Sequence, residues 1–171
     1  MKIVLLGYMG SGKSTIGKLL AQNMKLQFLD LDDCIEEGEG MDIPEIFKSK
    51  GELYFRKREF HYLEEVLNGK DNFVLSTGGG TPCYGKNMET ILGATNNVVY
   101  LKVSIPGLVA RLSKEKSERP LIRDIPDEEL PEFIGKHLFE RNAFYNRAHC
   151  IVVGDNKTPD EIALEIEGSI L

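Results

Sequence analysis

The feature that most constrains this chain is a glycine-rich segment at residues 7–14, GYMGSGKS. It matches the pattern G-x-x-x-x-G-K-[ST], in which glycines let backbone N–H groups converge on phosphate oxygens. The apolar run at residues 3–6 predicts a strand, and residues 15–21 continue as a helix whose N-terminus favours an anion. Strand, loop and helix in this order predict a phosphate-binding loop. In such a loop Lys13 reaches the outer phosphates, and the Ser14 hydroxyl suits a Mg²⁺ shell.

Short apolar runs alternate with longer segments of helical composition along the rest of the chain. We expect strands at residues 3–6, 28–29, 73–76, 98–102 and 151–153. Their apolar residues are nearly continuous, as in parallel strands that are covered on both faces. The segments between them are long enough for crossover helices, which predicts an α/β fold with a parallel sheet. The length of 171 residues fits a single domain, residues 1–171.

Composition and charge argue against several classes of protein. A net charge of −6 is unlike a general binder of nucleic acid or anionic membranes, which needs a basic surplus. Cys34, Cys83 and Cys150 contain no CxxC pair, so their spacing predicts neither a disulfide framework nor a zinc site. Only four consecutive apolar residues precede Gly7, too few for a signal peptide or a membrane helix. We therefore expect a cytoplasmic protein with reduced thiols.

Two segments in the second half of the chain carry clear local signals. Residues 113–132 are charged and contain three prolines, which predicts a mobile loop of the length that often serves as a lid. Thr158, Pro159 and Glu161 fit the N-cap, the first helical position and the reciprocal glutamate of a capping box. The last helix is therefore expected to begin at Pro159.

Acidic residues follow the second expected strand, at Asp30, Asp32 and Asp33. In extended backbone, Asp30 and Asp32 point to the same side, at the sheet edge that carries the phosphate-binding loop. One carboxylate could then hold hydrated Mg²⁺ while the other accepts a proton from an attacking hydroxyl. The alternative is that Asp32 or Asp33 simply caps a following helix. These residues alone leave both interpretations open.

A phosphate-binding loop alone does not distinguish a kinase from a GTPase or a motor ATPase. Residues 156–159, NKTP, are close to the guanine-reading motif Asn-Lys-x-Asp, but the fourth residue is proline, so guanine specificity is not expected. The third strand lacks the acidic end of a standard Walker B motif and runs into the glycines 78–80. A guanidinium can give a carboxylate two parallel hydrogen bonds, so arginines suit an anionic substrate. The candidates are Arg56, Arg58, Arg119 and Arg141.

Six motifs, in order and with similar spacing, resemble those of the shikimate kinase family and cover nearly the whole chain. Residues 7–21 resemble its phosphate-binding loop and helix. Residues 28–36, FLDLDDCIE, resemble F-x-D-[ST]-D-x-x-I-E, and residues 46–59 resemble I-F…G-E-x-x-F-R-x-x-E. The other three are the triple glycine, the Arg119-Pro120-Leu121 lid motif and the R-x-x-x-Y pattern at residues 141–145.

The resemblance implies a three-layer αβα P-loop kinase fold like that of nucleoside-monophosphate kinases, with a five-stranded parallel sheet in the order 2-3-1-4-5. It implies a substrate-binding segment at about residues 31–60 and a mobile lid at about residues 112–126. The implied reaction transfers the γ-phosphate of ATP to the 3-hydroxyl of shikimate, with Mg²⁺ as cofactor. That reaction is a step of chorismate and aromatic amino-acid biosynthesis.

The same resemblance implies roles for individual residues. Asp32 would bind the reacting hydroxyl and act as base, with Lys13 and Arg119 as the other catalytic residues. Ser14 and, through water, Asp30 would hold the metal. The implied ATP-binding residues are Gly10, Ser11, Gly12, Lys13, Ser14, Thr15, Arg111 against the adenine, Arg119 and Lys157. The implied substrate-binding residues are Asp32, Arg56, Gly79, Gly80, Arg141, Phe47 and Phe55, with Glu59 orienting Arg56.

Two residues depart from the family pattern. Leu31 replaces the small hydroxyl residue usual between the two aspartates, and Lys157 stands where related sequences often have arginine near the adenine.

The nearest alternative function is another small-molecule kinase of this architecture, for gluconate or a nucleoside monophosphate. A nucleotide-dependent switch is the alternative from a different class; Asp32 and Arg119 argue against it because a switch needs no alcohol base. We expect a monomer that acts on a small molecule and binds neither nucleic acid nor membrane.

Overall fold

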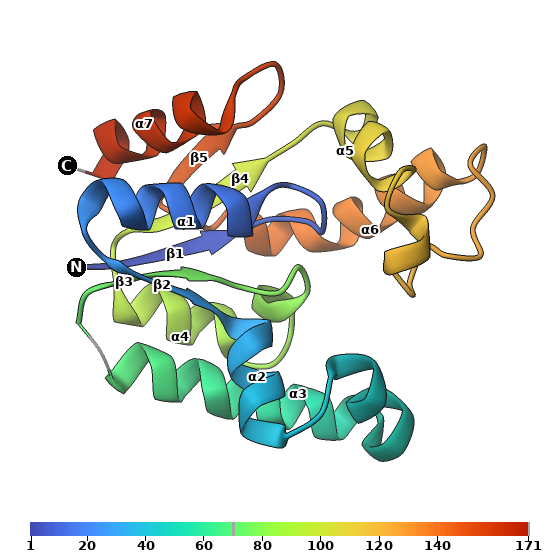
Figure 1. The fold of residues 1–171 in the computed structure, drawn as a ribbon, viewed down its shortest axis with the longest axis horizontal. Coiled ribbons are helices and arrows are strands. Elements are labelled where there is room, and N and C mark those ends of the chain that lie inside the picture. Colours follow the sequence, from blue (N-terminus) through green and yellow to red (C-terminus); the bar gives the residue numbers. More distant parts are fainter. Residues whose placement is uncertain (70, 171) are drawn as a thin grey trace.

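The computed structural model describes residues 1–69 and 71–170 and contains one sheet in the order β2-β3-β1-β4-β5 (Figure 1). Its strands are β1 (Lys2–Leu6), β2 (Gln27–Asp30), β3 (Phe73–Ser76), β4 (Val98–Lys102) and β5 (Cys150–Val153). Every neighbouring pair is parallel, and Leu5 of β1 is opposite Ser76 of β3 and Val99 of β4. The α/β class, the parallel sheet and the strand order are therefore confirmed.

Helices cover both faces of this sheet and make the three predicted layers (Figure 1). They are α1 (Lys13–Met24), α2 (Leu31–Glu39), α3 (Ile43–Gly69), α4 (Asn87–Ala94), α5 (Ile105–Leu112), α6 (Leu130–Tyr145) and α7 (Pro159–Ile170), with short 3₁₀ turns η1 (Thr81–Cys83) and η2 (Lys116–Glu118). Helices α1 and α7 pack on one face, and α3, α4 and α6 contribute to the core on the other. In the described range no helix is long and apolar enough to cross a membrane.

The central strands β3, β1 and β4 bury side chains on both faces, which explains their continuous apolar runs. Ile3 and Leu5 pack with α1 and α7, whereas Val4 and Leu6 pack into the larger core on the opposite face. All four are fully buried. Because side chains of a strand alternate between faces, one short strand stabilises both layers, at about 1.5–3 kcal/mol for each fully buried aliphatic side chain.

The second strand ends in a different way from the prediction. It continues through Asp30, and α2 begins immediately at Leu31. Asp32 therefore lies in the first turn of a helix and not in extended backbone, so the predicted extended alignment of the two aspartates is wrong. The helix is capped by Asp30, whose carboxylate accepts a hydrogen bond from the Asp32 backbone N–H at 3.0 Å. The predicted cap at Asp32 or Asp33 is wrong for the same reason.

The predicted loop at residues 113–132 is correct at its start and too long at its end. It contains the turn η2, and α6 begins at Leu130 with Pro131 inside its first turn. Proline is tolerated there because the first helical N–H groups have no partner within the helix. The capping box of the last helix is confirmed: Glu161 N–H donates to Thr158 Oγ1 at 3.2 Å, and Thr158 N–H donates to Glu161 Oε2 at 2.7 Å.

Helix α3 contains a break at Gly51, where φ is 84° and ψ is 171°. A Cβ at this position would meet no atom within 4 Å, so glycine is required by the positive φ and not by lack of space. The break separates the first turns of α3 from its longer second part, which carries Phe55, Arg56 and Glu59. It therefore sets the direction in which these side chains approach the strand ends.

We predict opposite effects for two glycine-to-alanine substitutions in helices. A Cβ on Gly17 of α1 would lie 2.6 Å from Phe28 Cε2 and 3.3 Å from Leu5 Cδ1, whereas a Cβ on Gly168 of α7 would meet nothing within 4 Å. Gly17→Ala should lower the free energy of unfolding by about 1–3 kcal/mol through overpacking. Gly168→Ala should raise it by about 0.5–1 kcal/mol by restricting the unfolded chain. Urea unfolding measures the free energy of unfolding of both variants. An equal change in the two variants would contradict the close packing at Gly17 and the open space at Gly168.

Candidate active site

The phosphate-binding loop connects β1 to α1 at the carboxyl edge of the sheet. Gly10 and Gly12 adopt φ values of 77° and 95°, which L side chains rarely adopt. The Lys13 ammonium is buried and donates to the carbonyl oxygens of Gly7 at 2.7 Å and Tyr8 at 3.1 Å. Burial lowers the pKa of Lys13 from 10.5 to about 8, although the carboxylates of Asp32 and Asp30 act in the opposite direction.

A cavity of about 360 Å³ extends from this loop to the ends of β2 and β3. Its lining residues come from four places: the loop with the start of α1, the β2–α2 junction, the segment after β3, and the chain from α5 onward. They are Met9, Gly10, Gly12, Lys13, Ser14, Thr15, Asp30, Asp32, Ser76, Thr77, Gly78, Gly79, Arg111, Glu115 and Arg119. Parallel topology explains this gathering, because the carboxyl ends of the strands share one edge of the sheet.

A hydroxyl and a carboxylate lie together on the wall of this cavity. Ser14 Oγ donates to Asp30 Oδ2 at 2.8 Å, while the other oxygen of Asp30 caps α2. Mg²⁺ takes oxygen ligands, keeps several waters and commonly uses only one or two carboxylates beside nucleotide phosphates. The donor set of Ser14 and Asp30 therefore fits a hydrated magnesium ion.

Asp32 is the carboxylate with the most perturbed environment in this cavity. Burial, together with the nearby carboxylates of Asp30 and Glu59, raises the pKa of Asp32 from 3.8 to about 6, against the attraction of Lys13. Its Oδ1 lies 3.2 Å from the position that a Cβ on Gly78 would occupy. A carboxylate with such a pKa is ionised at pH 7 and still basic enough to accept a proton.

Two guanidinium groups converge next to Asp32, on the glycines that follow β3. Arg56 Nη2 and Arg141 Nη2 each lie 3.3 Å from the position of a Cβ on Gly80, and Arg141 Nη1 lies 3.3 Å from that of a Cβ on Gly79. Any side chain at these two positions would press on the arginines or, at Gly79, on the phosphate-binding loop 3.2 Å away. The glycines therefore let two cations face one small region.

Glu59 holds Arg56 in place, as the resemblance implies. Arg56 Nη1 donates to Glu59 Oε1 at 2.9 Å, and the buried Thr81 hydroxyl donates to Glu59 Oε2 at 2.9 Å. On the other arginine, the Cζ of Arg141 lies 5.6 Å from the centre of the Tyr8 ring. Each guanidinium group thus has a partner of its own on the protein, Glu59 for Arg56 and the Tyr8 ring for Arg141.

The two predicted apolar walls form a pair beside Arg56. The rings of Phe47 and Phe55 lie 4.6 Å apart, with Phe55 buried in the core and Phe47 37% exposed. The Cζ of Arg56 lies 5.1 Å from the centre of the Phe55 ring. Phe55 thus serves the core and flanks the guanidinium, whereas Phe47 lies nearer the solvent.

Arginines from the chain after β4 complete the cavity. Arg111 Nη1 donates to the carbonyl oxygens of Gly10 and Ser11, at 3.2 and 3.1 Å. Arg119 Nε donates to Glu115 Oε2 at 2.8 Å, and its charge lowers the pKa of Lys13. Lys157 is not among the residues that line the cavity; its ammonium pairs with Glu165 of α7 instead.

Several residues of this site were not predicted from the sequence. The Tyr8 hydroxyl hydrogen-bonds to His137 Nδ1 of α6 at 2.9 Å, and Thr81 supports Glu59 from below the glycines. Tyr84 lies against Arg56, with Arg56 Cζ 3.6 Å from the ring centre. The position of Thr81 directly after the triple glycine was the one local signal; Tyr8, His137 and Tyr84 act through tertiary contacts without a sequence pattern.

Comparison with known proteins identifies the family. The family model described as "Shikimate kinase" matches residues 9–170. The chain belongs to the shikimate kinase family. Its relatives include the shikimate kinase of Flavobacterium psychrophilum, 46% identical, with the match covering 96% of each chain. Family membership confirms the resemblance drawn from the six motifs and favours a shikimate kinase over a gluconate kinase, a nucleoside-monophosphate kinase or a nucleotide-dependent switch.

Two solved shikimate kinases have the same fold. That of Bacteroides thetaiotaomicron is 36% identical with a TM-score of 0.91, and the match covers 98% of this chain and 97% of that one. That of Acinetobacter baumannii, solved in complex with shikimate, is 33% identical with a TM-score of 0.89, covering 99% of this chain and 92% of that one. The cavity described above therefore lies in the fold of an ATP-dependent phosphotransferase.

We predict that Asp32→Asn stabilises the ligand-free protein. Because the pKa of Asp32 is higher in the folded than in the unfolded chain, the wild type loses stability as pH rises from about 4 through 6. At pH 7.5 Asp32→Asn should therefore raise the free energy of unfolding by about 1–3 kcal/mol. Near pH 4 that advantage should largely vanish because the wild-type carboxyl is then mostly protonated. Urea unfolding at both pH values tests this, and an equal advantage at both would contradict the perturbed carboxylate.

Proposed function

We propose that this chain transfers the γ-phosphate of ATP to the 3-hydroxyl of shikimate, giving shikimate 3-phosphate and ADP. The observation that carries the proposal is the arrangement around the glycines after β3. Asp32 lies at Gly78, the guanidinium groups of Arg56 and Arg141 meet at Gly80, and the phosphate-binding loop lies alongside. One small molecule with a hydroxyl at one end and a carboxylate at the other matches these groups, and shikimate has that chemistry.

Asp32 acts as the base in the proposed reaction. The 3-hydroxyl oxygen attacks the γ-phosphorus, its proton passes to the Asp32 carboxylate, and the bond to the β,γ-bridging oxygen breaks to release ADP. Phosphoryl transfer goes through a loose transition state, so the protein contributes mainly positioning and charge stabilisation. Lys13 and Arg119 supply that positive charge, one from the loop and one from the segment after α5.

ATP is bound by the loop and by the chain that faces it. In this proposal Gly10, Ser11, Gly12 and Thr15 contribute backbone N–H groups, and Arg111 lies beside the adenine. Lys157 stays a prediction as an adenine contact, since its ammonium pairs with Glu165. Ser14 would hold Mg²⁺ directly, and Asp30 would do so through water. When bound, Mg²⁺ offsets phosphate charge.

The substrate is held by its carboxylate. Arg56 and Arg141 donate to it, the backbone of Gly79 and Gly80 lies beneath, and the rings of Phe47 and Phe55 form the apolar wall. A carboxylate accepts strong charge-assisted hydrogen bonds from guanidinium groups. This accounts for discrimination against neutral sugars, which offer neither guanidinium group an anion.

The remaining assignments follow from the same chemistry. We assign residues 1–171 to one kinase domain, with residues 31–60 as the substrate-binding segment and residues 112–126 as a lid that brings Arg119 to the phosphates. A monomer suffices because every group named here comes from one chain. The cytoplasm is the expected location, since it supplies ATP and keeps cysteine thiols reduced.

We predict that Asp32→Asn nearly abolishes turnover and leaves ATP binding intact. The wild type should release ADP with shikimate and not with gluconate or nucleoside monophosphates in a coupled assay. Asp32→Asn should reduce kcat by about 100-fold or more because the base is lost. Asp33→Asn is the matched control, since Asp33 is exposed and lies outside the cavity lining. Absence of shikimate-dependent turnover by folded wild-type protein would refute the proposed function.

We predict that the two convergent arginines bind substrate and not nucleotide. Arg56→Ala and Arg141→Ala should each raise the KM for shikimate by about 10- to 100-fold, the loss of one charge-assisted hydrogen-bonded pair. The KM for ATP should change less than about threefold. Arg147→Ala is the control, because Arg147 is exposed and pairs with Glu89 away from the glycines. Parallel losses of shikimate and ATP affinity would show that the pocket is misplaced.

A further inference from the structure

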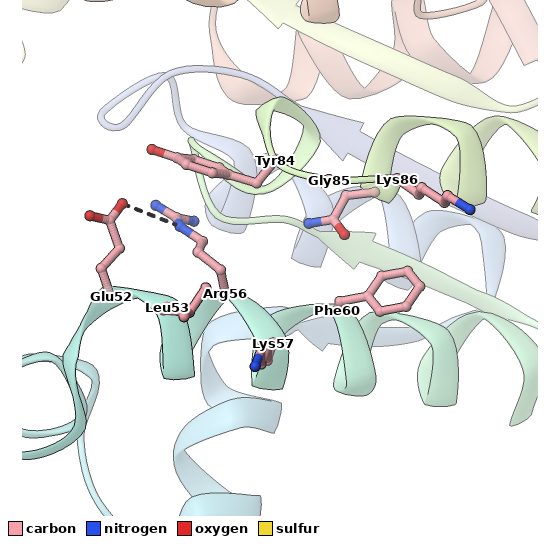
Figure 2. Close-up of a pocket in the computed structure, with 9 residues that line it drawn as sticks. Glu52, Leu53, Arg56, Lys57, Phe60, Tyr84, Gly85 and Lys86 are labelled. Atoms are coloured by element: carbon pink, nitrogen blue, oxygen red, sulfur yellow. Dashed lines mark ion pairs between the residues drawn. The ribbon is translucent and has the colours of Figure 1, made fainter.

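An aromatic ring covers the guanidinium that faces the proposed carboxylate site. Tyr84 follows η1, and the Cζ of Arg56 lies 3.6 Å from the centre of its ring. Figure 2 shows the ring above the guanidinium, on the side of the turn, while Glu52 approaches from the helix below. A cation this close to an aromatic face is attracted by the ring quadrupole, by about 0.5–2 kcal/mol.

The other contacts of Arg56 do not restrain the tilt of its guanidinium plane. Nη1 is held by Glu59 at 2.9 Å, but Glu52 Oε1 lies 3.9 Å from Nε, too far for a hydrogen bond. Nε is buried and donates no hydrogen bond to any described residue. One hydrogen bond from a terminal nitrogen leaves the group free to rotate about that contact, so its plane needs a second restraint.

We propose that Tyr84 is a positioning residue for shikimate, holding the plane of Arg56 so that Nη2 faces the substrate carboxylate. This inference rests on the proposed function. The geometry carries it: a Cβ on Gly80 would lie 3.3 Å from Tyr84 Cε2, from Arg56 Nη2 and from Arg141 Nη2 alike. The ring and both guanidinium groups therefore surround one position next to Gly80. The ring covers one face of the Arg56 guanidinium and leaves Nη2 available to the substrate carboxylate.

The ring also keeps water from one face of the guanidinium. A cation with one face shielded from water interacts more strongly with a further anion than a fully solvated cation does. Tyr84 thus acts through Arg56 and on the carboxylate end of the substrate only. It has no part in phosphate transfer, which takes place at the other end of the substrate.

The test is a KM and kcat comparison of Tyr84→Leu and Tyr84→Phe, with Phe60→Leu as the matched control. Phe60 lines the same surface cavity as Tyr84, and its ring points away from Arg56 (Figure 2). Tyr84→Leu should raise the KM for shikimate about 3- to 20-fold, with kcat and the KM for ATP unchanged within twofold. Tyr84→Phe keeps the aromatic face and should behave as the wild type, as should Phe60→Leu.

Two further measurements separate positioning from a structural role. The carboxamide analogue of shikimate should show the same KM with the wild type and Tyr84→Leu, because it carries no charge for Arg56. In an Arg56→Ala background, Tyr84→Leu should have no further effect on the KM for shikimate. Should Tyr84→Leu not fold, phenylalanines of increasing ring fluorination at position 84 keep the shape and weaken the cation attraction, and the KM should rise with fluorination.

The proposal is overturned by any of three results. These are a KM for shikimate within twofold of the wild type in Tyr84→Leu, an equal loss with the carboxamide analogue, or no trend with fluorination. Each presumes that the wild type phosphorylates shikimate. Failure of the wild type itself would instead refute the proposed function, so the two failures are distinguishable.

Discussion

Pairing between the parallel strands β1 and β3 sets the distance on which this site depends. Leu5 is opposite Ser76, and Thr77 continues the ladder by donating both its N–H and its hydroxyl to the Leu5 carbonyl, at 3.2 and 2.9 Å. Beyond this point one strand becomes the phosphate-binding loop and the other becomes the glycine segment. A shift of register by one residue would move the glycines relative to the loop and turn every side chain of β3 to the opposite face. The core and the site therefore depend on the same ladder.

Charge at the site is balanced over short distances and not by the composition of the chain. The protein carries a net charge of −6, yet both proposed ligands are anions. Lys13, Arg56, Arg119 and Arg141 gather at one sheet edge, and backbone N–H groups at the start of α1 add to their field. Against them stands Asp32, whose raised pKa reflects burial and neighbouring carboxylates. This carboxylate destabilises the folded state and is suited to accept a proton, a conflict typical of functional residues.

Much of this arrangement could be predicted from the sequence because its signals are local. The loop at residues 7–14 and the capping box at Thr158 each depend on spacing within a few residues, and both are present as predicted. The order of the sheet came from the family resemblance and is confirmed. The convergence of Arg56 and Arg141 was implied by resemblance alone, since each arginine in isolation is more often solvated on a surface.

Other features could not be predicted, for identifiable physical reasons. Which of three neighbouring aspartates caps α2 depends on where strand pairing stops, and β2 stays paired with β3 up to Asp30 and Ser76. The charged, proline-containing sequence before and at Pro131 predicts a loop, whereas a proline in the first turn of a helix costs no hydrogen bond. The contact of Tyr84 with Arg56 joins the chain after η1 to helix α3, and no pattern in the sequence connects these two segments. Such contacts follow from tertiary packing, to which a single sequence gives no access.

The bonds from Arg111 to the Gly10 and Ser11 carbonyls, and from His137 to Tyr8, have a joint mechanical consequence. Arg111 is in the last turn of α5 and His137 is in α6, so the chain between these helices is anchored at both ends to the loop of β1. Any movement of that intervening chain pivots about two supports that belong to one short loop. Between these supports Ile122 is fully buried in the core, so a displacement of this chain would have to expose an apolar side chain while both of its ends stay fixed.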